Sequence, residues 1–101
     1  MNMNQECSDK TDQKPWALVT GASAGIGTEF CRQLAAMGYR IVLVARREDK
    51  LRAVADELQA NYGAQSLIIP ADLTKHGASQ HIAERLEAEN IDIDYLVNNA
   101  G

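Results

Sequence analysis

The residues that most plainly indicate a chemical function are three closely spaced glycines, Gly21, Gly25 and Gly27. They belong to the run TGASAGIG over residues 20–27, which follows an apolar stretch and precedes a segment with helical periodicity. Glycines at such a turn allow a tight bend, a close approach of the backbone to a ligand, and close packing of the helix. The helix that begins there presents unpaired N–H groups and a partial positive charge. The run therefore predicts a pyrophosphate-binding loop.

Other glycine-loop patterns fit this run less well. A P-loop needs GxxxxGK followed by Ser or Thr, but Ile26 stands five positions after Gly21 and the loop contains no lysine. The common dinucleotide pattern GxGxxG also fails, since Ser23 occupies the place of its second glycine. The pattern present is TGxxxGxG, and the plain alternative is an ordinary glycine turn between a strand and a helix.

The periodicity of apolar residues predicts the strand and the helix that position this loop, and the elements that follow them. We expect strands over 16–20, 41–45, 67–69 and 93–97, and helices over 26–37, 51–62 and 78–86. In the first helix, Ile26, Phe30, Leu34 and Met37 are expected to form the buried face, with Gly38 ending the helix. This alternation predicts an α/β fold: a doubly wound parallel sheet with helices on both faces. The second and third strands should lie to one side of the first, and the fourth to the other.

Two further segments stand after later strands of this pattern. Asp72 and Leu73 follow the third strand, and the sequence NNAG occupies residues 98–101 after the fourth. Together with the glycine loop, in this order, they resemble the short-chain dehydrogenase/reductase family over residues 15–101. The resemblance implies a Rossmann-type sheet truncated after the fourth strand, and hydride transfer between a nicotinamide cofactor and a small carbonyl or alcohol substrate. It also implies a homo-oligomer for the full-length form.

The resemblance implies which residues bind the cofactor. The glycine loop would hold the pyrophosphate, Asp72 and Leu73 would cover the adenine, and the NNAG segment would complete the wall. The expected cofactor-binding residues are Gly21, Ser23, Ala24, Gly25, Ile26, Gly27, Arg46, Arg47, Asp72, Leu73, Asn99, Ala100 and Gly101. Residues 1–14 hold few apolar side chains and are expected to form a disordered polar tail. Residues 15–101 would then be the N-terminal part of a dinucleotide-binding Rossmann domain.

The choice between NADP(H) and NAD(H) depends on Arg46 and Arg47 at the end of the second strand. Sites that prefer NAD usually place an acid there, whereas a guanidinium suits a 2′-phosphate. We therefore expect NADP(H), with NAD(H) as the alternative. Ala24 counts against this choice, because family members that use NADP often carry a basic residue at its position. The plainer interpretation is that both arginines begin a solvated stretch and offset Glu48 and Asp49.

No catalytic residue is assigned in this sequence. The acid–base pair of the family is written YxxxK, and none of Tyr39, Tyr62 and Tyr95 has a lysine four residues later. The expected function is therefore the NADP(H)-binding part of a short-chain oxidoreductase that lacks its catalytic half and is inactive alone. The alternative is a non-catalytic dinucleotide-binding module or an inactive truncated gene product.

Composition and charge exclude other classes of function. The chain has 101 residues and a net charge of −4, which argues against general binding to nucleic acid. No apolar run is long enough to span a bilayer, and the first residues hold no signal sequence. Cys7 and Cys31 are expected to be free thiols in a reducing cytoplasm. His76 and His81 lack the spacing and the partners of a metal site.

Overall fold

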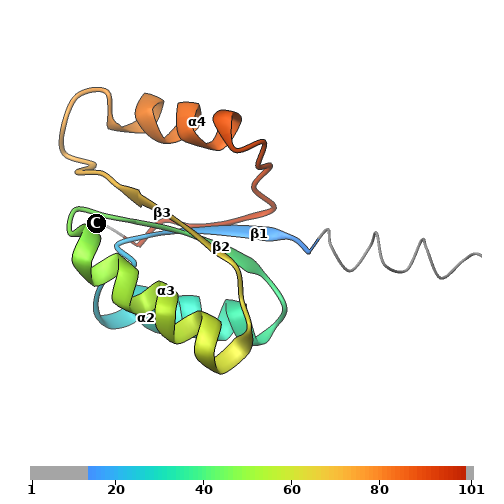
Figure 1. The fold of residues 1–101 in the computed structure, drawn as a ribbon. Helices are drawn as coiled ribbons and strands as arrows, with labels where there is room; N and C mark the ends of the chain where they lie inside the picture. The colour runs from blue at the N-terminus through green and yellow to red at the C-terminus, as the bar shows by residue number, and fades with distance from the viewer. Residues whose placement is uncertain (1–13, 100–101) are drawn as a thin grey trace, which may run out of the picture.

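The computed structural model describes residues 14–99, in which strands and helices alternate (Figure 1). The elements are β1 (Trp16–Thr20), α2 (Gly25–Ala36), β2 (Arg40–Ala45), α3 (Glu48–Tyr62), β3 (Ser66–Pro70), α4 (Ala78–Ala88) and β4 (Tyr95–Val97). The order predicted from apolar periodicity is confirmed. The expected polar tail, apart from Lys14, lies outside the described residues, as do Cys7, Ala100 and Gly101.

The four strands form one parallel sheet in the order β3-β2-β1-β4. Leu18 of β1 is the partner of Val42 in β2 on one side and of Leu96 in β4 on the other. Helices α2 and α3 cover one face of the sheet, and α4 lies over the opposite face (Figure 1). This is the doubly wound, Rossmann-type arrangement that the sequence predicts.

The two central strands are buried on both faces, which explains why they read as continuous apolar runs. Val19 and Leu43 point toward α2 and α3, whereas Leu18 and Val42 point toward α4 and pack in the cluster that contains Ile82. Successive side chains of a strand alternate between the faces, so each central strand contributes to two separate cores.

The buried face of α2 differs from the one that we expected. Ile26, Phe30 and Met37 are exposed, with 67%, 39% and 70% of their surface accessible, and only Leu34 of the expected set is buried. The buried residues of this helix are Gly27, Thr28, Cys31, Leu34 and Ala35. Most of these side chains are small, so the helix approaches the sheet and the glycine loop closely. The face of α2 that is buried is therefore the one that allows the closest contact with the sheet, and not the one with the largest apolar side chains.

Strand β4 begins at Tyr95, two residues later than we expected. The Asp94 carboxylate accepts a hydrogen bond from the backbone N–H of Trp16 at 3.0 Å, and the Asp94 N–H donates to the Trp16 carbonyl at 2.8 Å. Because a side-chain oxygen takes the place of a strand carbonyl there, regular pairing starts after Asp94. Ile93 packs instead against the core on the α4 side.

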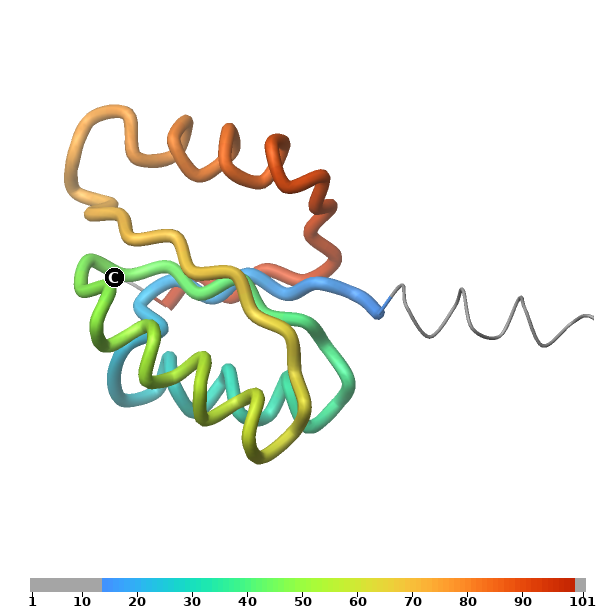
Figure 2. Tube along the Cα trace, viewed as in Figure 1, coloured from blue at the N-terminus to red at the C-terminus, as the bar shows by residue number. Residues whose placement is uncertain are grey.

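The loops that follow β1, β2 and β3 all lie at the same edge of the sheet (Figure 2). Parallel strands must end at a common edge, and ligands of such sheets bind outside the carboxyl ends where the strand order reverses. Here that reversal lies between β1 and β4. The fold thus places the glycine loop, Arg46, Asp72 and Asn99 at one edge.

Candidate functional site

The glycine loop leaves β1 through a backbone conformation that favours glycine. Gly21 has φ of 65° and Gly25 has φ of 59°, both in the left-handed region. Between them, the buried Ala22 donates its N–H to the Val44 carbonyl of β2 at 3.2 Å. The loop is therefore attached to the neighbouring strand before α2 begins.

Gly27 packs directly against the start of the same loop. A Cβ atom added at residue 27 would lie 1.9 Å from the carbonyl oxygen of Gly21 and 2.8 Å from Nδ2 of Asn99. The Thr28 hydroxyl, one residue later, donates to the Ala22 carbonyl at 2.9 Å in a buried position. The first turn of α2 can reach the loop this closely only because residue 27 has no side chain.

The N-terminus of α2 has no side chain that caps it. Its N-cap residue, Ala24, is extended with φ of −160°, and no acidic residue stands in the first turn. The first N–H groups of a helix have no acceptor within the helix, and their partial positive charge favours an anion. Ser23, partly buried, stands just before this end. The loop and the helix end together have the form of a phosphate cradle.

The described part of the NNAG segment, Asn98 and Asn99, is hydrogen-bonded to the end of β1 and to the glycine loop. Asn99 donates its backbone N–H to the Thr20 hydroxyl at 2.9 Å and its side-chain N–H to the Gly21 carbonyl at 3.5 Å. The Thr20 hydroxyl donates to Oδ1 of Asn98 at 3.2 Å. Two motifs that are far apart in the sequence are therefore in contact across β1 and β4.

The two arginines after β2 are in different environments. Arg47 forms an ion pair with Asp49, with Nη2 and Oδ2 3.2 Å apart, and this bond lowers the pKa of the Asp49 carboxyl. The interpretation that the arginines offset nearby acids therefore holds for Arg47. Arg46 is exposed and takes part in no ion pair within residues 14–99.

Asp72 is held in place by Thr74. Its Oδ1 accepts hydrogen bonds from the Thr74 N–H at 3.0 Å and from the Thr74 hydroxyl at 2.6 Å. These bonds lower the pKa of the Asp72 carboxyl, and the charges of Arg46 and Lys75 lower it further. The structure thus brings Arg46 and Asp72 near one another, as the adjacent ends of β2 and β3 require. Leu73, beside them, is partly exposed.

A cavity of ≈ 480 Å³ extends from the glycine loop along α3. Ser23 and Gly25 line it on the loop side, and Lys50 and Ala53 line it on the α3 side. We expected no residue of α3 in the site. Lys50 stands four residues after Arg46, in the first turn of the helix that follows β2.

The three tyrosines lie at the opposite edge of the sheet. Tyr39 immediately precedes β2, Tyr62 ends α3, and Tyr95 begins β4. The rings of Tyr39 and Tyr95 are 6.0 Å apart between centroids. None of the three is therefore near the glycine loop.

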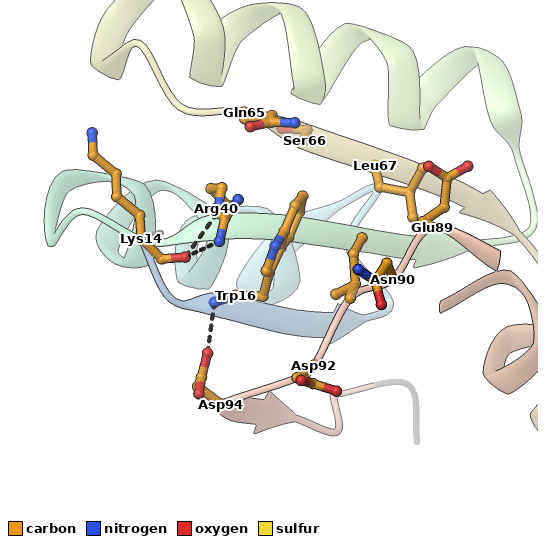
Figure 3. A pocket seen from close by; sticks show the side chains of 11 residues that line it. Lys14, Trp16, Arg40, Gln65, Ser66, Leu67, Glu89, Asn90, Asp92 and Asp94 are labelled. Carbon is orange, nitrogen blue, oxygen red and sulfur yellow. Dashed lines mark hydrogen bonds between the residues drawn. The ribbon is translucent and has the colours of Figure 1, made fainter. Parts of the chain in front are cut away.

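That opposite edge also holds a cavity of ≈ 660 Å³ (Figure 3). The Arg40 guanidinium lies 4.7 Å above the Trp16 ring and donates hydrogen bonds to the Lys14 carbonyl. Asp94, below the ring in Figure 3, binds the Trp16 N–H. These groups are engaged with one another in fastening β1 to β2 and to the start of β4.

Cys31 and the histidines add no second reactive centre. Cys31 is fully buried, and burial raises the pKa of its thiol to about 12. In the part of the chain that the structure describes, no three His, Cys, Asp or Glu side chains lie together as metal ligands. None of the described helices combines the length and the apolar character needed to cross a bilayer.

Comparison with known proteins identifies similar chains. The profile of the short chain dehydrogenase family matches residues 15–101. The chain is 45% identical over 87 residues to a very-long-chain 3-oxoacyl-CoA reductase of Ajellomyces capsulatus, which covers 85% of this chain and 26% of that protein. It is 42% identical over 86 residues to the Homo sapiens 17-beta-hydroxysteroid dehydrogenase type 3, with coverage of 85% and 27%.

Comparison with solved structures also identifies a similar reductase. The L-sorbose reductase of Gluconobacter frateurii, complexed with NADPH and L-sorbose, superimposes with a TM-score of 0.83 and 34% identity. That superposition covers 88% of this chain and 34% of the reductase. The chain thus spans about a quarter of the length of the curated relatives that it matches.

Proposed function

The chain belongs to the short-chain dehydrogenase family, and from this premise we propose that it binds NADP(H) at the carboxyl edge of its sheet. It would do so as part of an oxidoreductase that transfers hydride between the nicotinamide and a carbonyl or alcohol substrate. The proposed cofactor-binding residues are those that we expected from the sequence, with Ala100 and Gly101 outside the described part. The homo-oligomer implied by the resemblance and the cytoplasmic location inferred from the cysteines stay predictions.

The close packing of Gly27 carries this proposal. A loop that only reversed the chain would have no need for a glycine whose Cβ would meet both the Gly21 carbonyl and the Asn99 side chain. The N-terminus of α2 beside this contact has no side-chain cap. Residues present at this edge therefore fit the pyrophosphate of a dinucleotide.

Arg46 supports a preference for NADP(H) over NAD(H). It is the residue after β2, where an acid would accept hydrogen bonds from ribose hydroxyls and repel a 2′-phosphate. Because Arg46 is exposed and forms no ion pair within residues 14–99, its guanidinium can donate to that phosphate. Arg47 is less suited, since Asp49 already binds its Nε and Nη2.

The chemistry divides between the cofactor and the chain. A bound nicotinamide dinucleotide supplies or accepts the hydride. The glycine loop would hold its phosphates, and Asp72, which Thr74 holds in place, would lie beside the adenosine end. Asn99, which is bound to Thr20, would form part of the wall. We propose no proton donor among Tyr39, Tyr62 and Tyr95, because all three lie at the edge of the sheet opposite the glycine loop. The chain alone should therefore bind the cofactor without reducing a carbonyl substrate.

A titration with NADPH and NADH tests the proposal. Nicotinamide fluorescence should show saturable binding that favours NADPH, and Arg46→Asp should shift the preference toward NADH. Arg52→Asp is the control, because it reverses a charge on α3 that is paired with Glu48 and does not line the loop cavity. A folded chain that binds neither nucleotide would contradict the proposed function. Unchanged relative affinities in the Arg46→Asp chain would contradict only the role of Arg46.

A further inference from the structure

β3 forms one edge of the sheet and pairs with a neighbouring strand on one side only. In the order β3-β2-β1-β4 its partner is β2, and α3 and α4 lie on opposite faces of the sheet beside it (Figure 1). A strand at a sheet edge leaves half of its backbone N–H and C=O groups without a partner strand. An extended peptide can pair with those groups and add a strand to the sheet.

The hydrogen bonds to β2 show which residues of β3 face the open edge. The Gln65 carbonyl accepts a hydrogen bond from the Ile41 N–H at 3.0 Å. At the other end of the strand, the Ala71 N–H donates to the Ala45 carbonyl at 2.8 Å. The backbone groups of successive residues in a strand point alternately to its two sides. The odd-numbered residues of this segment therefore face β2, and the even-numbered residues face the open edge.

The residues of β3 that face the open edge are Ser66, Ile68 and Pro70. Ser66 and Ile68 each offer one N–H donor and one C=O acceptor there, whereas Pro70 offers its carbonyl alone. Within residues 14–99, the buried side-chain oxygen of Ser66 also has no hydrogen-bond partner. A buried polar group without a partner destabilises a protein, and a ligand that supplies the partner removes this cost. Both observations favour a ligand with its own backbone N–H and C=O groups.

A cavity of ≈ 490 Å³ runs along this edge. Four of the five residues of β3 line it, and the helices contribute its charged groups: Glu48 and Arg52 come from α3, and Arg85 comes from α4. The lining therefore carries one net positive charge, whereas the whole chain carries −4. A positive site on an acidic protein favours an acidic ligand, and it disfavours a second copy of the same positive surface.

The two arginines of this cavity keep hydrogen-bond donors for a ligand. Arg52 contacts Glu48 through Nη2 at 3.2 Å. Arg85 contacts Glu89 through Nη2 at 3.9 Å, which is beyond hydrogen-bonding distance. A guanidinium has five N–H donors, so most of those on each arginine are not engaged by a carboxylate of residues 14–99.

The other edge strand fits an acidic ligand less well. β4 has three residues, and its exposed side chains, Tyr95 and Leu96, are uncharged. Backbone groups alone would therefore attract an extended segment there, without a charge that selects an acidic one.

We propose that the β3 edge binds an extended acidic peptide segment of another protein as an additional strand. The peptide backbone pairs with Ser66 and Ile68, and its side chains alternate between the α3 face and the α4 face. Two adjacent acidic residues therefore point to opposite faces, one toward Arg52 and the other toward Arg85. The inference is independent of cofactor binding, because no residue of the glycine loop lines this cavity.

The test measures binding of a labelled peptide to the full chain by fluorescence anisotropy. The probe is the amidated peptide Ser-Thr-Val-Glu-Asp-Val-Thr-Ser with fluorescein at its N-terminus. Its threonines and valines favour the extended conformation, and its Glu-Asp pair supplies one carboxylate to each face. The control peptide has two lysines in place of the Glu-Asp pair. Amide hydrogen exchange, measured with and without the probe, locates the bound peptide on the chain.

Four variants separate charge from backbone pairing. Arg52→Gln and Arg85→Gln each remove one cation of the cavity, and Lys50→Gln is the matched control because Lys50 lies on α3 but outside this cavity. Ile68→Pro removes an N–H that faces the open edge and that β2 does not use. Circular dichroism shows whether each variant is folded, and the two arginine variants decide the outcome if Ile68→Pro does not fold.

The expected result is saturable binding of the acidic peptide and much weaker binding of the lysine peptide. Each arginine substitution should weaken binding about fivefold, which is the effect of one exposed ion pair, and Lys50→Gln should leave it unchanged. Folded Ile68→Pro should lose binding, and the bound probe should slow amide exchange at Ser66 and Ile68.

Several results would overturn the inference. Equal binding of the two peptides, or unchanged affinity in both arginine variants, would remove the role of charge. Slowed exchange at Val97 in place of Ile68 would locate the peptide at β4. Self-association of the chain through β3, detected by sedimentation without the probe, would make a second copy the occupant. A folded chain that does not bind the acidic peptide would also refute the proposal, whatever its affinity for NADPH.

Discussion

Replacing Gly27 with alanine tests the close contact on which the glycine loop depends. The new Cβ would lie 1.9 Å from the Gly21 carbonyl oxygen, and real Cβ atoms essentially never come within 3.0 Å of such an atom. The helix or the loop must therefore move apart by about 1.1 Å. The Gly21 oxygen belongs to the backbone, so it cannot rotate away from the new Cβ as a side chain could.

The expected loss of stability follows from two opposing effects. Overpacking against backbone belongs at the upper end of the usual range, about 3 kcal/mol. Alanine is a better helix former than glycine, which returns about 1 kcal/mol within α2. The free energy of unfolding should fall by about 2 kcal/mol, which lowers the Tm of a domain of this size by roughly 8–16 °C. Separation of the loop from α2 should also weaken NADPH binding.

Thermal unfolding followed by circular dichroism measures the loss, with Gly63→Ala as a matched control. Gly63 ends α3 with φ of 64°, and nothing lies within 4 Å of an added Cβ, so alanine there meets backbone strain without a clash. That strain should cost about 1 kcal/mol and leave NADPH binding unchanged. The reasoning is refuted if Gly27→Ala is as stable as Gly63→Ala and binds NADPH equally well.

Two further predictions concern titratable groups. Burial raises the pKa of the Cys31 thiol to about 12. In a Cys7→Ser chain, this thiol should therefore react with a thiol reagent far more slowly in the folded than in the denatured state. Equal reaction rates in the two states would contradict the burial. The pKa of the Asp72 carboxyl is lowered chiefly by hydrogen bonds from Thr74. The ionised carboxylate therefore stabilises the fold above the usual pKa of an aspartate, and this stabilisation is lost as the pH falls through the lowered pKa. Thr74→Val removes the hydroxyl and keeps the backbone N–H, and it should raise that pKa in an NMR titration of the carboxyl carbon. An unchanged pKa would show that the Thr74 hydroxyl is not its main cause.

The alternation of strands and helices was predictable because it depends on local periods. β1 and β2 are short apolar runs buried on both faces, and Gly63 ends α3 in the left-handed conformation that glycine favours. The parallel sheet and its order follow from crossover rules that apply to any such alternation. The position of the glycine loop at a strand-to-helix turn was predictable for the same reason. Its binding of a cofactor stays a prediction.

The details of the candidate site depend on contacts that the sequence pattern does not encode. Helical periodicity marks Ile26 and Phe30 as apolar, but it does not show that small residues on another face pack closer to the sheet. Adjacent arginines look equivalent in sequence, yet the start of α3 brings Asp49 to Arg47 and leaves Arg46 without an ion pair.

The sequence by itself determined the order of the strands, helices and tight turns of this protein, because backbone propensity and apolar spacing act over a few residues. Tertiary structure alone decided that Asn99 binds the carbonyl of Gly21 and that Lys50 shares a cavity with Ser23. These pairs are far apart in the chain, and they meet only because the parallel strands end at one edge while the helices pack beside them. The distance between two side chains at that edge depends on how closely every intervening element packs, which no local pattern records.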